Sequence, residues 1–345
     1  MIKNRIKNVL LGCLAILLII GGASMVNAKT WDKTFPKSDK VTVQKVEFKN
    51  RFGITLVGNL YTPKDAKGKL SAIAISGPFG AVKEQSSGLY AQTLAEKGFI
   101  TLAFDPSYTG ESKGTPRHVA SPDINTEDFS AAVDFLSIQR NVDPDKIGIL
   151  GICGFGGFAI NAAAIDTRIK ATTAVTMYDM TRVSAKGYND SVDENGRYDN
   201  KTALNKQRTE DFKNGSYKGA DGLPDKLTGN EPQFVKDYWG YYKTKRGFHA
   251  RSINSNGKWN MTSALSLINF PILQYSNEIR SAVLVVHGEN AHSRYFGEDA
   301  FKKLKGKNKE LLIVKGANHV DLYDGGDKKV IPFDKIESFY KEYLK

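Results

Sequence analysis

Cysteine is scarce in this sequence. Only Cys13 and Cys153 are present among 345 residues, and Cys13 lies in an N-terminal stretch that we expect to be removed. A single remaining thiol cannot form a disulfide within the chain. Cys153 is therefore either a buried, inert side chain or a reactive one, and this alternative decides the function.

Long runs of one charge, internal repeats and low-complexity tracts are absent as well. The formal net charge is +12, from 49 basic and 37 acidic residues, but the basic residues are scattered among acidic ones. This pattern argues against nucleic-acid binding and favours a solvated surface that suits an anionic cell envelope. A composition with 41% hydrophobic and 25% charged residues is typical of a globular protein, so we expect one large domain or one domain with an insertion.

The N-terminus has the three parts of a secretory signal peptide. Met1–Asn8 is basic, Val9–Ile20 is an unbroken apolar run, and Gly21–Ala28 is small and polar, in the order that signal peptides show. We expect residues 1–28 to be cleaved and the protein to be exported to the periplasm, the cell surface or the medium. The alternative is an uncleaved anchor, because Val9–Val26 is about the minimum length that spans a bilayer; only then would the membrane be a partner.

After a linker at residues 29–40, the pattern predicts a sheet. Val41–Phe48 and Ile54–Tyr61 alternate apolar and polar residues, which is typical of an antiparallel hairpin. Short apolar runs follow, and such runs indicate parallel strands that are buried on both faces. These runs are Ser71–Ser76, Ile100–Phe104, Ile147–Gly151, Ala171–Met177, Ala282–His287 and Leu311–Val314.

Helical stretches lie between these strands. They are Gly88–Lys97, Thr126–Gln139 with Thr126 as its N-cap, Gly154–Ile165, Gly297–Leu304 and Pro332–Leu344. Two antiparallel strands followed by repeated strand–helix units predict an α/β fold, in which a mostly parallel, twisted sheet carries helices on both faces. We assign residues 41–180 and 267–345 to this core.

Residues 181–266 interrupt the alternation of strands and helices. The stretch is polar and aromatic, has Gly, Asn and Asp turns, and contains no strand pattern. A segment of this length inside a compact domain is usually an insertion with short helices of its own. We expect a helical cap over the carboxyl ends of the strands.

The most informative segment is residues 151–157, Gly-Ile-Cys-Gly-Phe-Gly-Gly. A strand ends at a glycine, Cys153 follows two residues later, and a glycine-rich helix begins, which is the pattern of a nucleophile elbow. A helix N-terminus favours a thiolate, and the amide of Gly154 would point at a developing oxyanion. Phe155 departs from the usual elbow, which has a small residue there. The alternative is a structural cysteine in a glycine-rich turn.

The general base is expected from the loop after the last strand. His319 lies in such a loop, and the chain order of nucleophile and then histidine fits the same arrangement. A cysteine nucleophile needs an imidazole that takes its proton or forms an ion pair with it. We interpret His319 as the base that acts on Cys153; a surface histidine is the alternative.

Two further loops could contribute to the site. The turn Ser76–Gly80 follows the first buried strand, and the backbone amide of Phe79 is our candidate for the second oxyanion donor. The polar turn Phe104–Ser112 follows the next strand, and from it Tyr108 could contact a substrate.

The acid of a catalytic triad has no obvious position. It is expected three residues after Gly288, where the sequence has Ala291. Glu289 lies next to this place, and Asp179 follows another strand. We rank Glu289 ahead of Asp179, and a dyad without an acid stays open because a thiolate needs less help than an alkoxide.

These segments resemble the α/β-hydrolase superfamily, in particular its dienelactone-hydrolase-like branch and the YcjY-like bacterial hydrolases. The likeness covers roughly residues 41–345. The segments that carry it are residues 77–80, 151–157, 288–293 and 318–324. The resemblance implies the α/β-hydrolase fold, Cys153 as the nucleophile, His319 as the base, and hydrolysis of esters, lactones or thioesters without a cofactor. The glutamate that primes the cysteine in dienelactone hydrolase would fall near Gly77, so dienelactone itself is not the expected substrate.

We therefore predict an enzyme that hydrolyses an ester, lactone or thioester of a small acyl substrate through a Cys153 acyl-enzyme. Two alternatives stay open: a degenerate hydrolase that only binds a ligand under its aromatic cap, and a thiol protein for acyl transfer or redox sensing. No metal is expected, because His287 and His292 lack a third ligand with definite spacing, and no cofactor. The sequence leaves the acyl group, the leaving group and the oligomeric state open.

Overall fold

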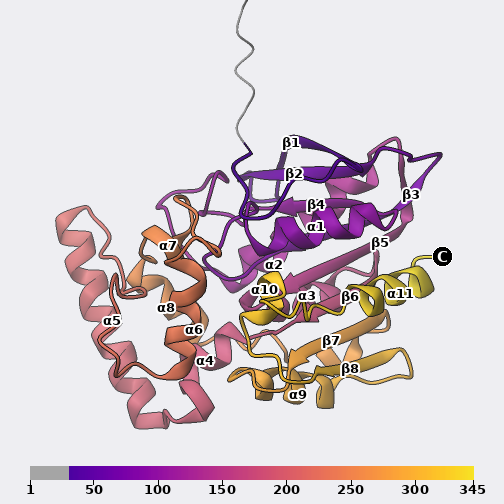
Figure 1. Cartoon of the computed structure of the whole chain (residues 1–345). Coiled ribbons are helices and arrows are strands. Elements are labelled where there is room, and N and C mark those ends of the chain that lie inside the picture. Colours follow the sequence, from indigo (N-terminus) through magenta and orange to yellow (C-terminus); the bar gives the residue numbers. More distant parts are fainter. Residues whose placement is uncertain (1–30) are drawn as a thin grey trace, which may run out of the picture. The chain divides into compact units, whose positions relative to one another are not determined.

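One mixed sheet organises residues 31–345, the part of the chain that this computed structural model describes. The order of its strands is β1-β2-β4-β3-β5-β6-β7-β8 (Figure 1). β2 pairs antiparallel with β1 and with β4, and all other pairs are parallel. The strands are β1 (Val41–Lys49), β2 (Thr55–Pro63), β3 (Leu70–Ser76), β4 (Ile100–Phe104), β5 (Val142–Ile152), β6 (Ile169–Val175), β7 (Ala282–Gly288) and β8 (Lys309–Val314). The predicted signal peptide, residues 1–28, lies outside the described residues.

Eleven α-helices and three short 3₁₀ helices accompany these strands in the described residues. None of them is long and apolar enough to cross a bilayer. The helices are α1 (Ser86–Glu96), α2 (Pro122–Ser137), α3 (Gly154–Ile165), α4 (Met180–Lys186), η1 (Tyr188–Asp190), α5 (Glu194–Asn214), α6 (Gln233–Tyr242), α7 (Ile253–Asn256), η2 (Met261–Ser263), α8 (Ala264–Ile268), η3 (Ser276–Glu278), α9 (Arg294–Lys303), α10 (Asp321–Asp324) and α11 (Phe333–Tyr343).

Helices cover both faces of the sheet, as predicted. The side chain of Ile149 on β5 lies in the apolar core with Phe129 of α2 and Phe158 of α3. At the neighbouring Gly148, an added Cβ would instead meet the ring of Tyr340 on α11. Because successive residues of a strand point to opposite faces, α2 and α3 lie on one face and α11 on the other. The predicted α/β architecture is confirmed.

The second helix begins earlier than the sequence pattern predicts. The expected N-cap, Thr126, lies inside α2, and the observed N-cap is Ser121, whose hydroxyl accepts a hydrogen bond from the Ile124 amide at 3.4 Å. Pro122 takes the first helical position, where a missing N–H costs nothing. The Thr126 hydroxyl donates to the Pro122 carbonyl at 2.6 Å, a bond that helical threonines often make.

The described part of the predicted linker, residues 31–40, is packed against the core. Phe35 is buried, and the side chain of Gln92 on α1 fixes the backbone around it. Its Oε1 accepts from the Ser38 amide at 3.1 Å, and its Nε2 donates to the Pro36 carbonyl at 2.9 Å. This segment therefore packs against the domain and is part of its folded structure.

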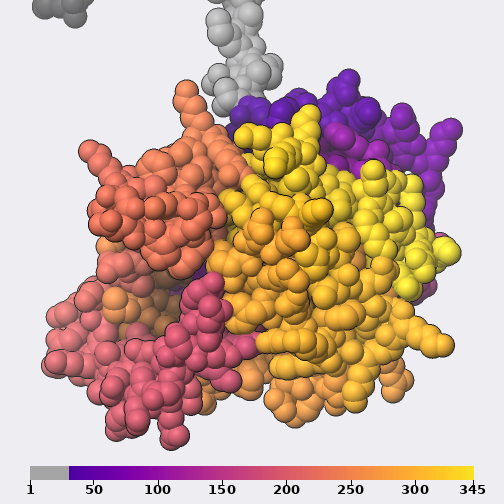
Figure 2. All heavy atoms as spheres, turned by 60° about the horizontal axis from the view of Figure 1, so that its bottom comes forward, coloured from indigo at the N-terminus to yellow at the C-terminus, as the bar shows by residue number. Residues whose placement is uncertain are grey.

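The predicted cap, residues 181–266, is built from short helices and the longer α5, with no strand among them. In Figure 1, α5, α6 and α7 lie together beside the sheet, and in Figure 2 this stretch, pink to orange, lies against the yellow C-terminal part of the core. Tyr238 and Tyr242 of α6 line the same pocket as Cys153, which directly follows β5. The insertion therefore contributes side chains beside the carboxyl end of β5.

Candidate active site

Cys153 occupies the sharp turn between β5 and α3. Its backbone has φ +56° and ψ −125°, a conformation that costs about 1–3 kcal/mol in a non-glycine residue and is retained mainly at functional sites. An added Cβ at Gly151 would lie only 2.0 Å from the Phe155 carbonyl oxygen, so the turn needs glycine there. The unusual Phe155 is accommodated because its ring packs in the core against Phe129 and Phe158. This is the geometry of a nucleophile elbow.

The thiol of Cys153 is nearly enclosed, with 7% of the residue exposed. Burial raises its pKa, whereas hydrogen bonds from the Tyr323 hydroxyl, from the backbone amides of Gly154 and Phe79, and from Tyr238 favour the thiolate and offset part of the rise. An added Cβ at Gly154 would lie 2.7 Å from the Phe79 Cβ, and Phe79 lines the same pocket as Cys153, so the two residues whose amides the sequence singles out are neighbours at this pocket. A thiol with a raised pKa is protonated at neutral pH, so a nearby base has to take its proton.

His319 lies in the loop between β8 and α10 and is fully buried. Its Nδ1 is 2.6 Å from the Ser293 hydroxyl and 2.9 Å from the Thr176 hydroxyl, and its Nε2 is 2.9 Å from the Tyr323 hydroxyl. Burial lowers the pKa of the imidazole well below 6.5, and the neighbouring His292 adds to this effect. The ring is therefore neutral at physiological pH, and one of its two hydrogen-bonded nitrogens carries no proton and can accept one.

The structure brings Cys153 and His319 to one place, but a tyrosine separates them. The Tyr323 hydroxyl is hydrogen-bonded to His319 Nε2 at 2.9 Å, and Tyr323 lines the same pocket as Cys153, where its hydroxyl lowers the pKa of the thiol. Within residues 31–345 no hydrogen bond joins the sulfur directly to the imidazole. Tyr323 carried no recognisable sequence signal, although it follows His319 by only four residues.

Neither predicted acid contacts the imidazole. Glu289 is exposed, and its carboxylate accepts a hydrogen bond from the Gly316 amide at 2.8 Å. Asp179 caps α4 by accepting from the Thr181 amide at 3.0 Å. Glu289 follows the last residue of β7 directly and turns outward, whereas the chain approaches the imidazole only four residues later, at Ser293. The prediction of Glu289 as the partner of the imidazole is wrong, and hydroxyl groups occupy that place.

The cap holds the loop that carries Phe79. Asn254 of α7 donates from Nδ2 to the Phe79 carbonyl at 2.8 Å, and Ser252 donates to the Gly80 carbonyl at 2.8 Å. Gly80 has φ +86°, and an added Cβ would lie 2.5 Å from Asn254 Oδ1, so only glycine permits this close approach. Asn254 and Ser252 carried no recognisable sequence signal, because single polar residues in a cap are common.

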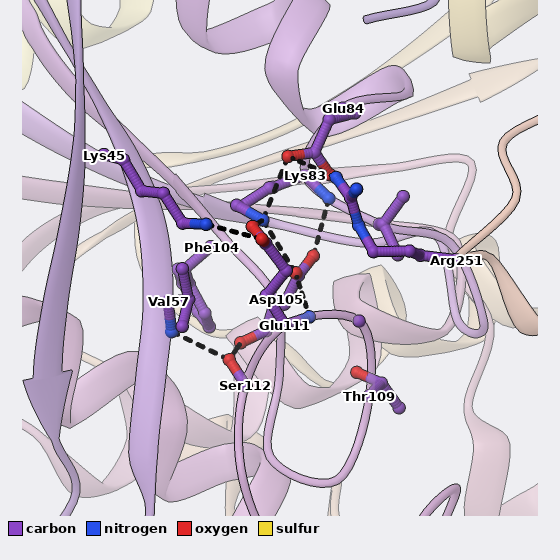
Figure 3. Close-up of polar contacts among 12 residues, drawn as sticks. Lys45, Val57, Lys83, Glu84, Phe104, Asp105, Thr109, Glu111, Ser112 and Arg251 are labelled. Carbon is purple, nitrogen blue, oxygen red and sulfur yellow. Dashed lines mark hydrogen bonds and ion pairs between the residues drawn. The ribbon is translucent and has the colours of Figure 1, made fainter. Parts of the chain in front are cut away.

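The same loop continues into a buried ionic cluster (Figure 3). Lys83 is completely buried, and its Nζ lies 2.9 Å from Asp105, 2.9 Å from Glu84 and 2.6 Å from Glu111. Burial alone would lower the pKa of Lys83, but the carboxylates of Asp105 and Glu84, with a hydrogen bond to Glu111, hold it well above its ordinary value. The ammonium therefore stays charged inside the protein.

Two further cations complete the cluster. Lys45 of β1 lies 2.5 Å from Glu111, and Arg251 of the cap lies 3.1 Å from Glu84. Three cations then face three carboxylates, so the buried charges are paired. The Lys83 cluster, as we call it, consists of Lys45, Lys83, Glu84, Asp105, Glu111 and Arg251. It joins the Phe79 loop to the sheet on one side and to the cap on the other.

The pocket beside Cys153 has a volume of about 290 Å³ and a mainly aromatic and apolar lining. The lining residues are Phe79, Cys153, Tyr178, Met180, Val183, Leu223, Tyr238, Tyr242, Asn254 and Tyr323. No ionic side chain is among them, so a charged group would lose its hydration there without a counter-ion. Tyr108, the predicted substrate contact, does not line this pocket. A larger cavity of about 630 Å³ beside α4 and α9 contains neither Cys153 nor His319.

Two other histidines surround His319 without forming a metal site. His287 is fully buried, and burial lowers its pKa to about 3; His292 has a pKa of about 4 for the same reason, and its Nε2 is 2.5 Å from the Tyr178 hydroxyl. Both rings are neutral at physiological pH. No group of three or more His, Cys, Asp and Glu side chains in residues 31–345 is arranged to hold a metal ion.

Comparison with known proteins reveals similar chains along nearly the whole length. The sequence is 57% identical over 329 residues to the uncharacterized protein PA2218 of Pseudomonas aeruginosa, with 94% of this chain and 87% of that protein covered. It is 34% identical over 305 residues to the uncharacterized protein YcjY of Escherichia coli K12, with 87% and 99% covered. The crystal structure of PA2218 matches with a TM-score of 0.88 over 91% of this chain and 98% of that one.

Other similarities are shorter or more distant. A family model described as PET hydrolase-like matches residues 34–187. The thiohydrolase aneE of Aspergillus aculeatus is 36% identical over 138 residues, which are 40% of this chain and 42% of that protein. The structure of Est1E from Butyrivibrio proteoclasticus with ferulic acid bound has 19% identity and a TM-score of 0.59, over 87% of this chain and 99% of that one, a likeness of fold alone.

Proposed function

Because the chain belongs to the α/β-hydrolase superfamily, in the family of PA2218 and YcjY, we propose that it hydrolyses ester-type bonds with Cys153 as the nucleophile. The fold that the sequence predicts is that of this superfamily and is confirmed. One observation carries the proposal: Cys153 occupies a strained strand-to-helix turn, with φ +56°, in the wall of an apolar pocket that Phe79 also lines.

The reaction proceeds through an acyl-enzyme. The Cys153 sulfur attacks the substrate carbonyl, and the amides of Gly154 and Phe79 bind the oxyanion that develops beside the sulfur. One such donor contributes about 100- to 1000-fold in rate. His319 receives the thiol proton and returns it to the leaving group, and it then deprotonates the water that cleaves the acyl-enzyme.

Ser293 is the competing nucleophile, because its hydroxyl is 2.6 Å from His319. Ser293 does not line the pocket, and it contacts Nδ1, the imidazole nitrogen on the side away from Tyr323. Cys153 has the strained turn, the two amides and the pocket together. Ser293 instead orients the imidazole, in the place where a triad has a carboxylate.

The pocket favours an uncharged acyl group. A volume of about 290 Å³ is at the small end for ligand sites and fits a single ring or a short chain. Aromatic side chains and the absence of ionic ones disfavour acyl groups that carry a carboxylate. The similarity to a thiohydrolase and to a PET hydrolase-like model supports thioesters and aryl esters, whose good leaving groups suit a thiol that lacks a triad carboxylate.

The first test compares Cys153→Ala with the unmodified chain on p-nitrophenyl acetate and on an aryl thioester. We expect kcat/KM to fall by about 1000-fold or more for both substrates, because the covalent route is lost. Ser293→Ala is the control for the competing nucleophile and should keep a measurable fraction of the activity. Full activity in Cys153→Ala would refute the assignment.

Acyl transfer is a second candidate function, since the nucleophile is only 7% exposed and the apolar pocket limits access of water. An alcohol or amine added to the assay would then compete with water for the acyl-enzyme. Ester or amide product at millimolar acceptor, with little free acid, would favour transfer over hydrolysis. A protein that only binds a ligand would give neither product.

A further inference from the structure

Tyr323 connects the imidazole of His319 with the pocket that contains the Cys153 thiol. Its hydroxyl lies 2.9 Å from His319 Nε2, and the residue shares the pocket wall with Cys153. The ring is fully buried and packs against the rings of Tyr241, with centroids 5.1 Å apart, and Tyr242, at 6.1 Å; these ring contacts do not involve the Tyr241 hydroxyl. The hydroxyl is therefore held beside the imidazole, at the wall of the pocket that contains the sulfur.

We propose that Tyr323 is a catalytic residue whose hydroxyl relays the proton from the Cys153 sulfur to His319 Nε2. The inference rests on the proposed role of Cys153 as the nucleophile. In the forward step the S–H bond breaks as the tyrosine oxygen takes that proton, and the tyrosine O–H bond breaks as Nε2 takes the other. The products are a thiolate bonding to the carbonyl carbon, a neutral tyrosine and an imidazolium; the reverse transfers deliver a proton to the leaving group.

The surroundings require both transfers to occur together. No carboxylate of residues 31–345 is hydrogen-bonded to Cys153, Tyr323 or His319, so nothing nearby stabilises a separated ion pair. Burial raises the pKa of Tyr323 well above 10 and lowers that of His319 well below 6.5. Tyrosinate and imidazolium are therefore both disfavoured at rest. A relay in which the tyrosine gains one proton as it loses another avoids a charged tyrosine altogether.

A different role for the same side chain would be to keep sulfur and imidazole apart, as in a hydrolase that no longer works. The two roles make opposite predictions for Tyr323→Phe, which removes the hydroxyl and retains the ring. A relay predicts slower acylation. A barrier predicts no loss of rate, or faster acylation once water or the imidazole reaches the sulfur.

The experiment measures the pre-steady-state burst of p-nitrophenol, whose rate reports acylation. For Tyr323→Phe we expect a burst rate about 100-fold lower, as for loss of a general acid–base group, and little change in KM. Tyr241→Phe is the matched control: it removes a phenol hydroxyl that is equally buried and adjoins Tyr323, but it does not line the pocket. Its rate should stay within about twofold. An unchanged or higher burst rate in Tyr323→Phe overturns the relay.

A proton inventory separates a relay from a purely structural role and does not depend on how well the variant folds. In mixtures of H₂O and D₂O the acylation rate of the unmodified chain should curve with deuterium fraction, because two protons move in one step. A linear dependence overturns the relay. A different result would refute the proposed function, namely retention of activity in Cys153→Ala. Failure of the relay and failure of the proposed function are therefore distinguishable.

Discussion

The loop between β3 and α1 joins two buried sites of opposite character. At Phe79 it borders the pocket of Cys153, whose lining contains phenol rings and an amide side chain and no ionic side chain. At Lys83, four residues later, it enters a cluster of three cations and three carboxylates. The residues between Phe79 and Lys83 thus connect a pocket without ionic side chains to a cluster of six charged ones.

The difference follows from what each site has to do. Inside a protein, paired charges fix geometry strongly, because breaking a pair leaves an uncompensated charge in a poor solvent. Lys83 and its partners therefore fix the loop to the sheet and, through Arg251, to the cap. At Cys153 the sulfur changes between the neutral thiol and the negative thiolate during the reaction. A fixed charge nearby would favour one of these two states over the other. Neutral hydroxyls and amides adapt to both states.

Breaking the charged site should give the largest effect on stability. Lys83→Met retains the length of the side chain but leaves Glu84, Asp105 and Glu111 with too few cations, and we expect the free energy of unfolding to fall by about 3–5 kcal/mol. Chemical denaturation at neutral pH measures it. Lys146→Met is the matched control, since Lys146 is partly exposed and its one carboxylate is 3.5 Å away; it should change stability by less than about 0.5 kcal/mol. A loss below 1 kcal/mol for Lys83→Met would contradict the account.

Loosening the connection between the two sites should affect catalysis more than stability. Asn254→Ala removes the hydrogen bond from the cap to the Phe79 carbonyl, so the Phe79 amide is held less firmly beside the sulfur. We expect kcat to fall about 10-fold, a fraction of the effect of deleting an oxyanion donor outright. Asn256→Ala, on the same short helix but outside the pocket lining, should leave kcat unchanged. Equal effects of the two substitutions would argue against positioning by Asn254.

Adding a charge to the neutral site should shift a pH profile without a large change in maximal rate. The active imidazole is the deprotonated one, and burial lowers the pKa of His319, so kcat/KM should hold as pH falls to 6.5 and decline only below it. Ser293→Asp supplies a carboxylate at Nδ1, which favours the imidazolium. The acidic limb should then move to higher pH. A limb at or above pH 6.5 in the unmodified chain would show that the imidazole is not held neutral by burial.

The sequence predicted those parts of the molecule that depend on local pattern. Strand runs and the Gly-x-Cys-Gly turn are local, so the sheet and the position of Cys153 followed from neighbouring residues. The partner of His319 did not, because the geometry of the chain after β7, rather than spacing from Gly288, brings Ser293 to the imidazole. Glu289 and Ser293 are both two residues from the usual acid position at Ala291, but Glu289 turns outward.

The Lys83 cluster was equally hidden from the sequence. Lys83, Asp105 and Glu111 lie on loops, where charged residues are usually solvated, and Arg251 lies in the cap. Their spacing in the sequence does not predict that four segments, namely β1, the loops after β3 and β4, and the cap, meet at one buried cluster. Tyr323 illustrates the intermediate case: its spacing from His319 is local, but a tyrosine one turn after a histidine has no meaning until the position of the thiol is known.

Trapping the acyl-enzyme tests the central assignment most directly. The chain is quenched in acid during turnover of a slow aryl ester, and intact and peptide mass spectrometry locates the acyl group. The account predicts one acyl adduct, on the peptide that contains Cys153, and none in Cys153→Ala. An adduct on Ser293, or continued turnover in Cys153→Ala, would contradict it.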